Sequence, residues 1–369
     1  MTSREALTAL NLLPRIGPVR VRRLLEAFGD PASVLRAPKD RLMRVDGIGA
    51  ETAGILHSWQ DHADPIAELK EAAERGIAVV TQEDEDYPSS LRDAYDPPLL
   101  LYVWGKIEPR DKHAISVVGS RRATLYGTQA TKKLTFGLAH AGFTIISGLA
   151  RGIDTAAHEA ALAANGRTIA VIGSGLGKLY PPENMSLAER IADGNGAVVS
   201  EFPLNTPPGK QTFPMRNRIV AAWSRALLVT ECPLWSGSLI TANLASEYGK
   251  PIYAVPGPID KPTSAGCNQL IRDGATLVAD AAHMLDDLGD LPFARKESAA
   301  SPVAEASTDA PELPEEEATV FAAVSTDELP VDRIIERCGL PAHVVTANLM
   351  KLEMRRLVRA FPGFRYARR

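Results

Sequence analysis

The 369-residue sequence is poor in cysteine and contains no long apolar run. Its three cysteines, Cys232, Cys267 and Cys338, lie far apart and form no CxxC pair. This spacing argues against a disulfide framework or a zinc site and fits a reducing compartment. No run reaches the ~18 apolar residues of a membrane helix, and the first residues lack the features of a signal peptide. We therefore expect a cytoplasmic protein without a membrane span or a metal site.

An excess of basic residues is also missing. The chain has 41 Lys and Arg against 45 Asp and Glu, which gives a net charge of -4. Any binding to nucleic acid would therefore depend on local basic patches and not on the charge of the whole chain. The length allows two or three domains.

The pattern of residues 1–75 predicts a domain of short helices. The stretches "LPRIGPVRVRRLLEAFG" and "LMRVDGIGAETAGIL" each place a glycine-bearing turn before a helix, which is the helix-hairpin-helix pattern of SAM-like domains. Such turns present backbone N–H groups that can bind a nucleic-acid phosphate. Arginines at positions 15, 20, 22 and 23 flank the first turn. DNA contact and a packing module with solvated arginines are the two interpretations of this domain.

Residues 76–290 alternate short runs rich in Val and Ile with amphipathic stretches. Nine such runs, from "GIAVV" to "ATLVAD", are predicted strands, and stretches such as "GTQATKKLTFGLAHAG" are predicted helices. The alternation is typical of the α/β class with a doubly wound, mostly parallel sheet. We expect the first two strands to extend a Rossmann-like core.

The last part of the chain begins with a change in composition. Residues 291–316 are rich in Ala, Pro, Ser and Glu, which predicts a flexible linker. Residues 317–369 then predict two helices around the turn "CGLP" and a glycine-bearing hairpin, the layout of a winged-helix domain. Duplex DNA contact is one interpretation of this domain. The start of its second helix, "PAHVVTANL", has no Lys or Arg, which favours a protein-interaction module with a basic tail.

Five stretches that follow predicted strands resemble phosphate-binding turns. They are "GSRRAT" (119–124), "SGLARGID" (147–154), "GSGLGK" (173–178), "FPMRNR" (213–218) and "WSGSLIT" (235–241). Ligands of open parallel sheets bind beyond the carboxyl ends of the strands, so we expect all five at one edge. The first turn has Arg121 where a dinucleotide site needs its second glycine, and "GSGLGKL" departs from the Walker A spacing. No nucleotide cofactor is predicted.

Basic residues are concentrated in these turns and around them. Candidates for DNA binding are Ser120, Arg121, Arg122, Arg151, Lys210, Phe213, Arg216, Asn217 and Arg218. Lys178 adds a seventh basic residue, and Tyr126, Tyr180 and Trp235 join Phe213 as interleaved aromatics. A single nucleotide needs about two or three cationic groups, whereas rows of phosphates need more. Because bases of any identity stack on aromatic rings, this composition favours a single-stranded nucleic acid.

Acidic residues near the same edge leave room for other interpretations. Asp154 and His158 are four residues apart, and a helix cap at Asp154 is favoured over an acid–base pair. Glu201 and Glu231 end predicted strands and serve either as general bases or to orient arginines. The alternative function is therefore a nucleotide-processing enzyme similar to phosphoribohydrolases, with "WSGSLITA" as its glycine-rich loop and Glu231 at a ribose.

The sequence from about Asp86 to Asp280 resembles the DNA-processing protein A family, also called Smf. The resemblance rests on "VVGSRRATLYG", "SGLARGIDTAAHEAAL", "SEFPLNTPPGKQTFPMRNRIVAAWS" and "SGSLITANLASEYGKPIYAVPG". It implies a homodimer without enzymatic activity or cofactor that binds and protects incoming single-stranded DNA. It also implies loading of a RecA-type recombinase during natural transformation.

The resemblance also implies which residues form the DNA pocket. By motif, the family's pocket corresponds here to Ser120, Arg122, Lys210, Phe213 and Asn217. Arg121 neighbours Arg122 and is an alternative to it, because the sequence does not say which side chain faces the groove.

Overall fold

The computed structural model describes residues 1–289, 314–325, 329–355, 357–361 and 365–368. The chain divides into two compact units, residues 1–294 and 295–369, which are described separately. The predicted linker, residues 291–316, lies outside the described residues except for its last three. Within the described ranges, no helix is both long and apolar enough to span a bilayer.

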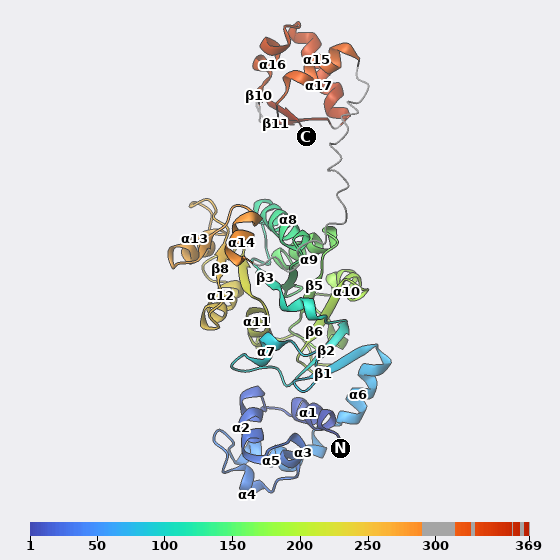
Figure 1. The fold of residues 1–369 in the computed structure, drawn as a ribbon, viewed down its shortest axis with the longest axis vertical. Coiled ribbons are helices and arrows are strands. Elements are labelled where there is room, and N and C mark those ends of the chain that lie inside the picture. Colours follow the sequence, from blue (N-terminus) through green and yellow to red (C-terminus); the bar gives the residue numbers. More distant parts are fainter. Residues whose placement is uncertain (290–313, 326–328, 356, 362–364, 369) are drawn as a thin grey trace. The chain divides into compact units, whose positions relative to one another are not determined.

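Six helices form the first part of the larger unit (Figure 1). They are α1 (Ser3–Leu12), α2 (Pro18–Phe28), α3 (Pro31–Arg36), α4 (Lys39–Leu42), α5 (Ala50–His57) and α6 (Pro65–Glu74). Gly17 and Gly49 occupy the cap positions of α2 and α5, so both predicted helix-hairpin-helix turns form. Leu99 packs into the apolar core of these helices.

Three of the four arginines of the first hairpin contact the second hairpin. Arg15 pairs with Glu51 at 2.5 Å, and Arg20 Nε donates a hydrogen bond to the Gly47 carbonyl at 3.2 Å. Arg23 pairs with Asp46 at 2.8 Å. These side chains therefore connect the two hairpins to each other and are not simply solvated.

A nine-stranded sheet forms the centre of the larger unit. Its strands are β1 (Ile77–Thr81), β2 (Leu100–Gly105), β3 (Ala114–Val118), β4 (Thr144–Ser147), β5 (Thr168–Val171), β6 (Gly196–Ser200), β7 (Ala226–Val229), β8 (Ile252–Ala254) and β9 (Thr276–Leu277). Their order is β1-β2-β6-β5-β4-β3-β7-β8-β9. Strands β3 to β9 pair in parallel with one another, and β2 pairs antiparallel with both β1 and β6. The predicted extended, doubly wound sheet is confirmed.

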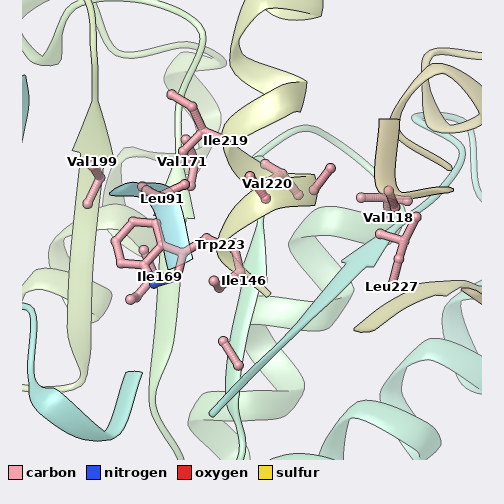
Figure 2. Close-up of a cluster of buried hydrophobic side chains, with 14 of the residues drawn as sticks. Leu91, Val118, Ile146, Ile169, Val171, Val199, Ile219, Val220, Trp223 and Leu227 are labelled. Carbon is pink, nitrogen blue, oxygen red and sulfur yellow. The ribbon is translucent and has the colours of Figure 1, made fainter. Parts of the chain in front are cut away.

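Helices cover both faces of this sheet (Figure 1). The remaining helices of the unit are α7 (Ser89–Arg92), α8 (Leu125–His140), α9 (Ile153–Ala163), α10 (Met185–Ala192), α11 (Thr212–Trp223), α12 (Gly237–Glu247), α13 (Ala265–Arg272) and α14 (Ala281–Leu288). Side chains alternate along β3, so that Ile115 and Val117 join the core beneath α8 and α9, while Val118 joins the opposite core. In that second core, Trp223 of α11 packs with Ile146 and Ile169 (Figure 2). Every residue of β3 to β7 is buried, and burial on both faces explains why these five strands are mostly apolar.

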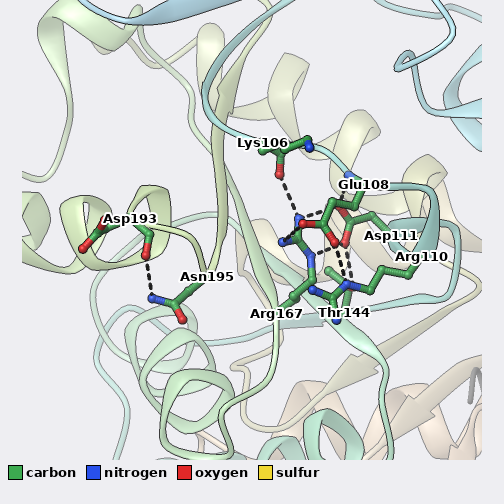
Figure 3. A network of polar contacts seen from close by, with 8 residues as sticks. All are labelled: Lys106, Glu108, Arg110, Asp111, Thr144, Arg167, Asp193 and Asn195. Atoms are coloured by element: carbon green, nitrogen blue, oxygen red, sulfur yellow. Dashed lines mark hydrogen bonds and ion pairs between the residues drawn. The ribbon is translucent and has the colours of Figure 1, made fainter.

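A buried polar network joins the amino ends of three neighbouring strands (Figure 3). Arg167, which precedes β5, donates to both carboxylate oxygens of Asp111 at 2.9 Å, and it also pairs with Glu108 at 3.1 Å. Thr144, the first residue of β4, donates to Asp111 at 2.8 Å. Asp111 lies in the short helix just before β3. This network fixes the end of the sheet that lies opposite the carboxyl ends of the strands.

The smaller unit has the predicted winged-helix layout. It contains α15 (Glu315–Ala323), β10 (Leu329–Pro330), α16 (Val331–Cys338), α17 (Ala342–Met354), β11 (Val358–Phe361) and β12 (Arg365–Arg368), with the strand order β10-β12-β11. Helix α15 begins two residues before the expected start at residue 317. Two residues of the basic tail make contacts within the unit: Arg355 pairs with Glu317 at 3.2 Å, and Arg368 lies 4.4 Å from the Phe321 ring centre.

Candidate nucleic-acid interface

A pocket of about 630 Å³ lies at the carboxyl ends of β3, β4 and β7. Strands β3 and β7 are neighbours in the sheet, but the chain continues from β3 to β4 on one side and from β7 to β8 on the opposite side. An open α/β sheet binds its ligands at such a point. Seven of the nine predicted residues line the pocket: Ser120, Arg121, Arg122, Lys210, Phe213, Arg216 and Asn217. Arg151 and Arg218 do not line it.

The turn after β3 is held by a set of hydrogen bonds. The Ser120 N–H donates to the Glu231 carbonyl at 2.7 Å, and the Ser120 hydroxyl accepts from the Arg122 N–H at 3.1 Å. The Glu231 carboxylate accepts from the Thr124 N–H and hydroxyl at 2.8 and 2.7 Å. Thr124 in turn caps α8 by accepting from the Gly127 N–H. These hydrogen bonds connect the turn to Glu231 just after β7 and to the first turn of α8.

The turns after β3 and β4 interlock. The Ile153 N–H donates to the Ser120 carbonyl at 3.1 Å. Gly152 has a φ of 76°, and a Cβ at this position would collide with the Ser120 carbonyl oxygen. Glycine is required at residue 152 both by its backbone conformation and by this close approach.

Both arginines of the first turn face the pocket. Arg121 and Arg122 are exposed and line it, which answers the question of which of the two points outward. The Arg121 guanidinium lies 4.8 Å from the centre of the Phe213 ring. A cation and an aromatic face are thus presented together at the mouth of the pocket.

Helix α11 supplies the facing wall. Phe213 and Asn217 are one turn apart and lie on the same side of the helix, and Lys210 precedes the helix as an exposed residue. The Asn217 amide donates to the Gly237 carbonyl at 3.4 Å. An amide, an ammonium and a ring therefore line one side of the groove.

Arg216 forms the floor of the pocket and is only 4% exposed. Its guanidinium donates to the Gly148 carbonyl at 2.6 Å and to the Val171 carbonyl, which join the carboxyl ends of β4 and β5. Burial lowers the pKa of Arg216 to about 10, Asp154 opposes this shift, and Arg121 adds to it. Arg216 stays charged at neutral pH and adds to the positive potential of the pocket.

Asp154 does not cap α9 as predicted. Gly152 occupies the cap position, and the Asp154 carboxylate accepts from the N–H groups of Gly148 and Ala150 at 3.1 and 3.3 Å. Burial raises the pKa of Asp154, and the Arg216 charge opposes the shift. Asp154 thus orders the turn that precedes the helix.

His158 contacts β5 and not the turn. Its Nδ1 lies 2.7 Å from the Thr168 hydroxyl, and its Nε2 is buried with no hydrogen-bond partner in the described part of the chain. Burial, with a smaller effect of Arg216, lowers the pKa of His158 to about 3. The imidazole is neutral in the folded protein at physiological pH.

This burial predicts a pH dependence of stability. The pKa of His158 is 6.5 in the unfolded chain and about 3 in the folded chain. The contribution of the neutral imidazole to the free energy of unfolding is therefore fully present above pH 6.5 and is lost as the pH falls. The loss between pH 6.5 and pH 5 should be about 1.5 kcal/mol. Urea unfolding of the wild type and of His158→Gln across this range measures it, and equal pH dependence in both proteins would contradict it.

Arg218 is turned away from the pocket, against the sequence-based expectation. It is 8% exposed, pairs with Glu201, and lies 3.3 Å from the Asp96 carboxylate. Burial raises the pKa of Glu201 to about 7, and the Arg218 charge opposes this shift. Glu201 therefore orients an arginine, which was one of its two predicted roles.

Arg151 and Lys178 are exposed outside the pocket. Arg151 forms an ion pair with Glu183 and lies 6.0 Å from the Tyr180 ring centre.

Several pocket residues were absent from the predicted set. Ser236, which precedes α12, and Gly237, Ser238 and Thr241 at the start of that helix line the pocket. The phosphate-binding pattern "WSGSLIT" was the available signal for these, although no individual hydroxyl was singled out. Thr263 also lines the pocket, and no sequence pattern marked it, because the loop after β8 brings it there only in the folded chain.

The pocket presents hydrogen-bond donors and one aromatic ring to a ligand. Three of its four basic side chains are exposed at the surface, and the fourth lies beneath them. Guanidinium and ammonium groups bind phosphate oxygens, and the Phe213 ring offers a surface on which a base can stack. The arrangement is suited to binding a polyanion that carries planar groups.

Three family models match segments of the chain. A model described as DNA recombination-mediator protein A matches residues 78–289. The DprA winged helix domain matches residues 304–363, and a SAM-like helix-hairpin-helix tandem matches residues 7–56.

Individual proteins are similar over much of the chain. Protein Smf of Synechocystis sp. is 35% identical over 382 residues, which cover 96% of each chain. The X-ray structure of DNA processing protein A (DprA) from Streptococcus pneumoniae has a TM-score of 0.68 at 33% identity and covers 78% of this chain and 98% of that one. DNA processing protein A from Helicobacter pylori, whose structure concerns a single-stranded DNA binding mode, has a TM-score of 0.52 at 33% identity and covers 57% of this chain and 95% of that one.

Proposed function

The chain belongs to the DNA recombination-mediator protein A family, and from this membership we propose that its pocket binds single-stranded DNA. The observation that carries the proposal is that three exposed cations, Arg121, Arg122 and Lys210, line one pocket at the carboxyl edge of the sheet together with an aromatic ring. Charges of this kind bind phosphates irrespective of sequence, and the ring stacks any base. Asn217 and Ser120 add neutral donors.

The proposal extends to the role of the bound strand. In it, the protein protects incoming single strands and loads a RecA-type recombinase onto them during natural transformation. It acts in the cytoplasm as a homodimer and catalyses no reaction. The family's description as a recombination mediator supports this extension.

Glu231 favours DNA binding over the nucleotide-processing alternative. That alternative needs a carboxylate free to act at a ribose, but both Glu231 carboxylate oxygens accept hydrogen bonds from Thr124. Glu231 is 1% exposed and does not line the pocket. If chromatography detected free base released from nucleoside monophosphates by the protein, the nucleotide-processing alternative would be favoured instead.

Lys210→Ala tests the proposed function. We expect it to weaken oligothymidine binding, because it removes one exposed ammonium from the groove. The slope of log affinity against log salt should become shallower by about 0.7, the value for one phosphate contact on a single strand. Fluorescence anisotropy at a series of salt concentrations measures both effects.

The matched control is Lys112→Ala. Lys112 is exposed in the short helix before β3, at the opposite end of the strands, and its loss should leave the slope unchanged. Wild-type binding that does not respond to salt, or equal slopes for Lys210→Ala and the wild type, would contradict the proposal.

A further inference from the structure

A row of two aromatic rings between two cations continues beyond the pocket. Arg121 lies over Phe213, the Phe213 and Tyr180 ring centres are 6.0 Å apart, and Arg151 lies 6.0 Å from the Tyr180 ring centre. Of these four residues only Arg121 and Phe213 line the pocket. Tyr180 and Arg151 therefore form a step adjacent to the pocket and outside it.

Tyr180 and Arg151 lie on the side of the pocket that faces β5. Arg151 follows β4, and Tyr180 belongs to the segment that follows β5. Because the pocket lies over β3, β4 and β7, the step extends the same edge of the sheet toward β5. A strand that leaves the pocket in this direction meets the Tyr180 ring next.

The side chains of this step are available to a ligand. Tyr180 is 36% exposed and belongs to none of the apolar cores of the described residues. The Arg151 and Glu183 side chains are 55% and 47% exposed. An ion pair this exposed contributes little to stability, so a phosphate can take the place of the Glu183 carboxylate at little cost.

We propose that Tyr180 and Arg151 form a second nucleotide subsite, in which a base stacks on Tyr180 and its phosphate replaces Glu183 as the partner of Arg151. The subsite rests on the proposed function, since the pocket holds the preceding nucleotides. The single strand thus runs from β3 across β4 toward β5. Glu183 competes with the incoming phosphate and weakens binding at this step.

The test compares oligothymidines of increasing length, from about four to about twelve nucleotides, a range typical of single-strand sites. Tyr180→Ala should bind the shortest oligonucleotides as the wild type does, because these fill only the pocket. It should bind the longer ones about tenfold more weakly, as expected for one lost stacking contact. Tyr180→Phe keeps the ring and should behave like the wild type.

Arg151 and Glu183 give independent readouts. Arg151→Ala changes an exposed side chain and should make the salt slope for long oligonucleotides shallower by about 0.7, with no change for the shortest. Glu183→Gln should strengthen binding of the long oligonucleotides. The matched control is Tyr95→Ala, since Tyr95 is an exposed ring with Arg22 5.0 Å from its centre and lies outside the pocket.

The results that overturn the subsite differ from those that overturn the proposed function. The subsite is ruled out if Tyr180→Ala binds oligothymidines of every length as tightly as the wild type does. It is also ruled out if the variant loses the same affinity at every length. A Glu183→Gln variant that fails to strengthen binding rules it out as well. Wild-type protein that binds no oligothymidine of any length rules out the proposed function itself.

Discussion

The double variant Arg121→Ala/Arg122→Ala will bind oligothymidine about a hundredfold more weakly than the wild type at physiological salt. It removes two of the three exposed cations that line the pocket. Hydrogen bonds to charged groups contribute about 1.5–3 kcal/mol each, and a hundredfold change corresponds to about 2.7 kcal/mol. The loss of two phosphate contacts should also make the salt slope shallower by about 1.4. Anisotropy titrations at several salt concentrations measure both quantities.

Two comparisons make this result specific to the pocket. Arg190→Ala/Arg272→Ala removes two exposed arginines of the same unit that do not line it, and it should bind like the wild type. Oligonucleotides of thymine, adenine and cytosine should all be weakened alike, because phosphate contacts carry no base information. An unchanged salt slope in the Arg121/Arg122 double variant would show that these guanidinium groups do not contact phosphates.

Asp111→Ala will lower the free energy of unfolding by about 3 kcal/mol, at the lower end of the ~3–5 kcal/mol range for breaking a buried ion pair. Asp111 is 1% exposed, and the variant leaves the buried Arg167 without its bidentate partner. Glu108 remains 3.1 Å from Arg167 and still pairs with it. The expected loss of unfolding free energy is therefore at the lower end of the range. Urea unfolding followed by tryptophan fluorescence measures the change, since Trp223 is buried in the sheet core.

Asp193→Ala is the matched control for this prediction. Asp193 is an exposed aspartate (Figure 3) whose main-chain carbonyl, and not its carboxylate, accepts from Asn195. Its replacement should change stability by less than about 0.5 kcal/mol. Oligothymidine affinity should be unaffected in folded Asp111→Ala, because the network lies at the opposite end of the strands from the pocket. A strong loss of affinity in the folded variant would contradict this separation.

The strands could be predicted because burial on both faces leaves apolar runs that sequence patterns detect. All nine predicted runs became strands. Their order was beyond such patterns, since hydrogen bonding between β3 and β7 joins segments more than a hundred residues apart. The carboxyl edge was nevertheless predictable, because helices between strands imply parallel neighbours whose ends coincide.

Site residues were predicted best where a motif sat directly at a strand end. Arg121 and Arg122 lie in such a turn, and both line the pocket. On α11 the motif alone was insufficient, because Arg216 and Asn217 line the pocket whereas the next residue, Arg218, does not. Arg218 meets Glu201 and Asp96, partners that are far away in the sequence. Tyr180 was among the predicted aromatics, but its neighbours could not be predicted, since Phe213 lies in α11 and Arg151 in the turn after β4.

The interlocked turns at Ser120 and Gly152 have a consequence for protein engineering. Because the Ser120 carbonyl oxygen occupies the space that a side chain at residue 152 would need, any exchange of the second turn must keep glycine at that position. A graft of residues 148–154 from a homologue into this scaffold, or a library randomised there, must therefore hold residue 152 fixed as glycine, whereas the side chains of residues 121 and 122 can be varied without this conflict. Any other residue at position 152 would collide with the backbone of the turn that carries Arg121 and Arg122.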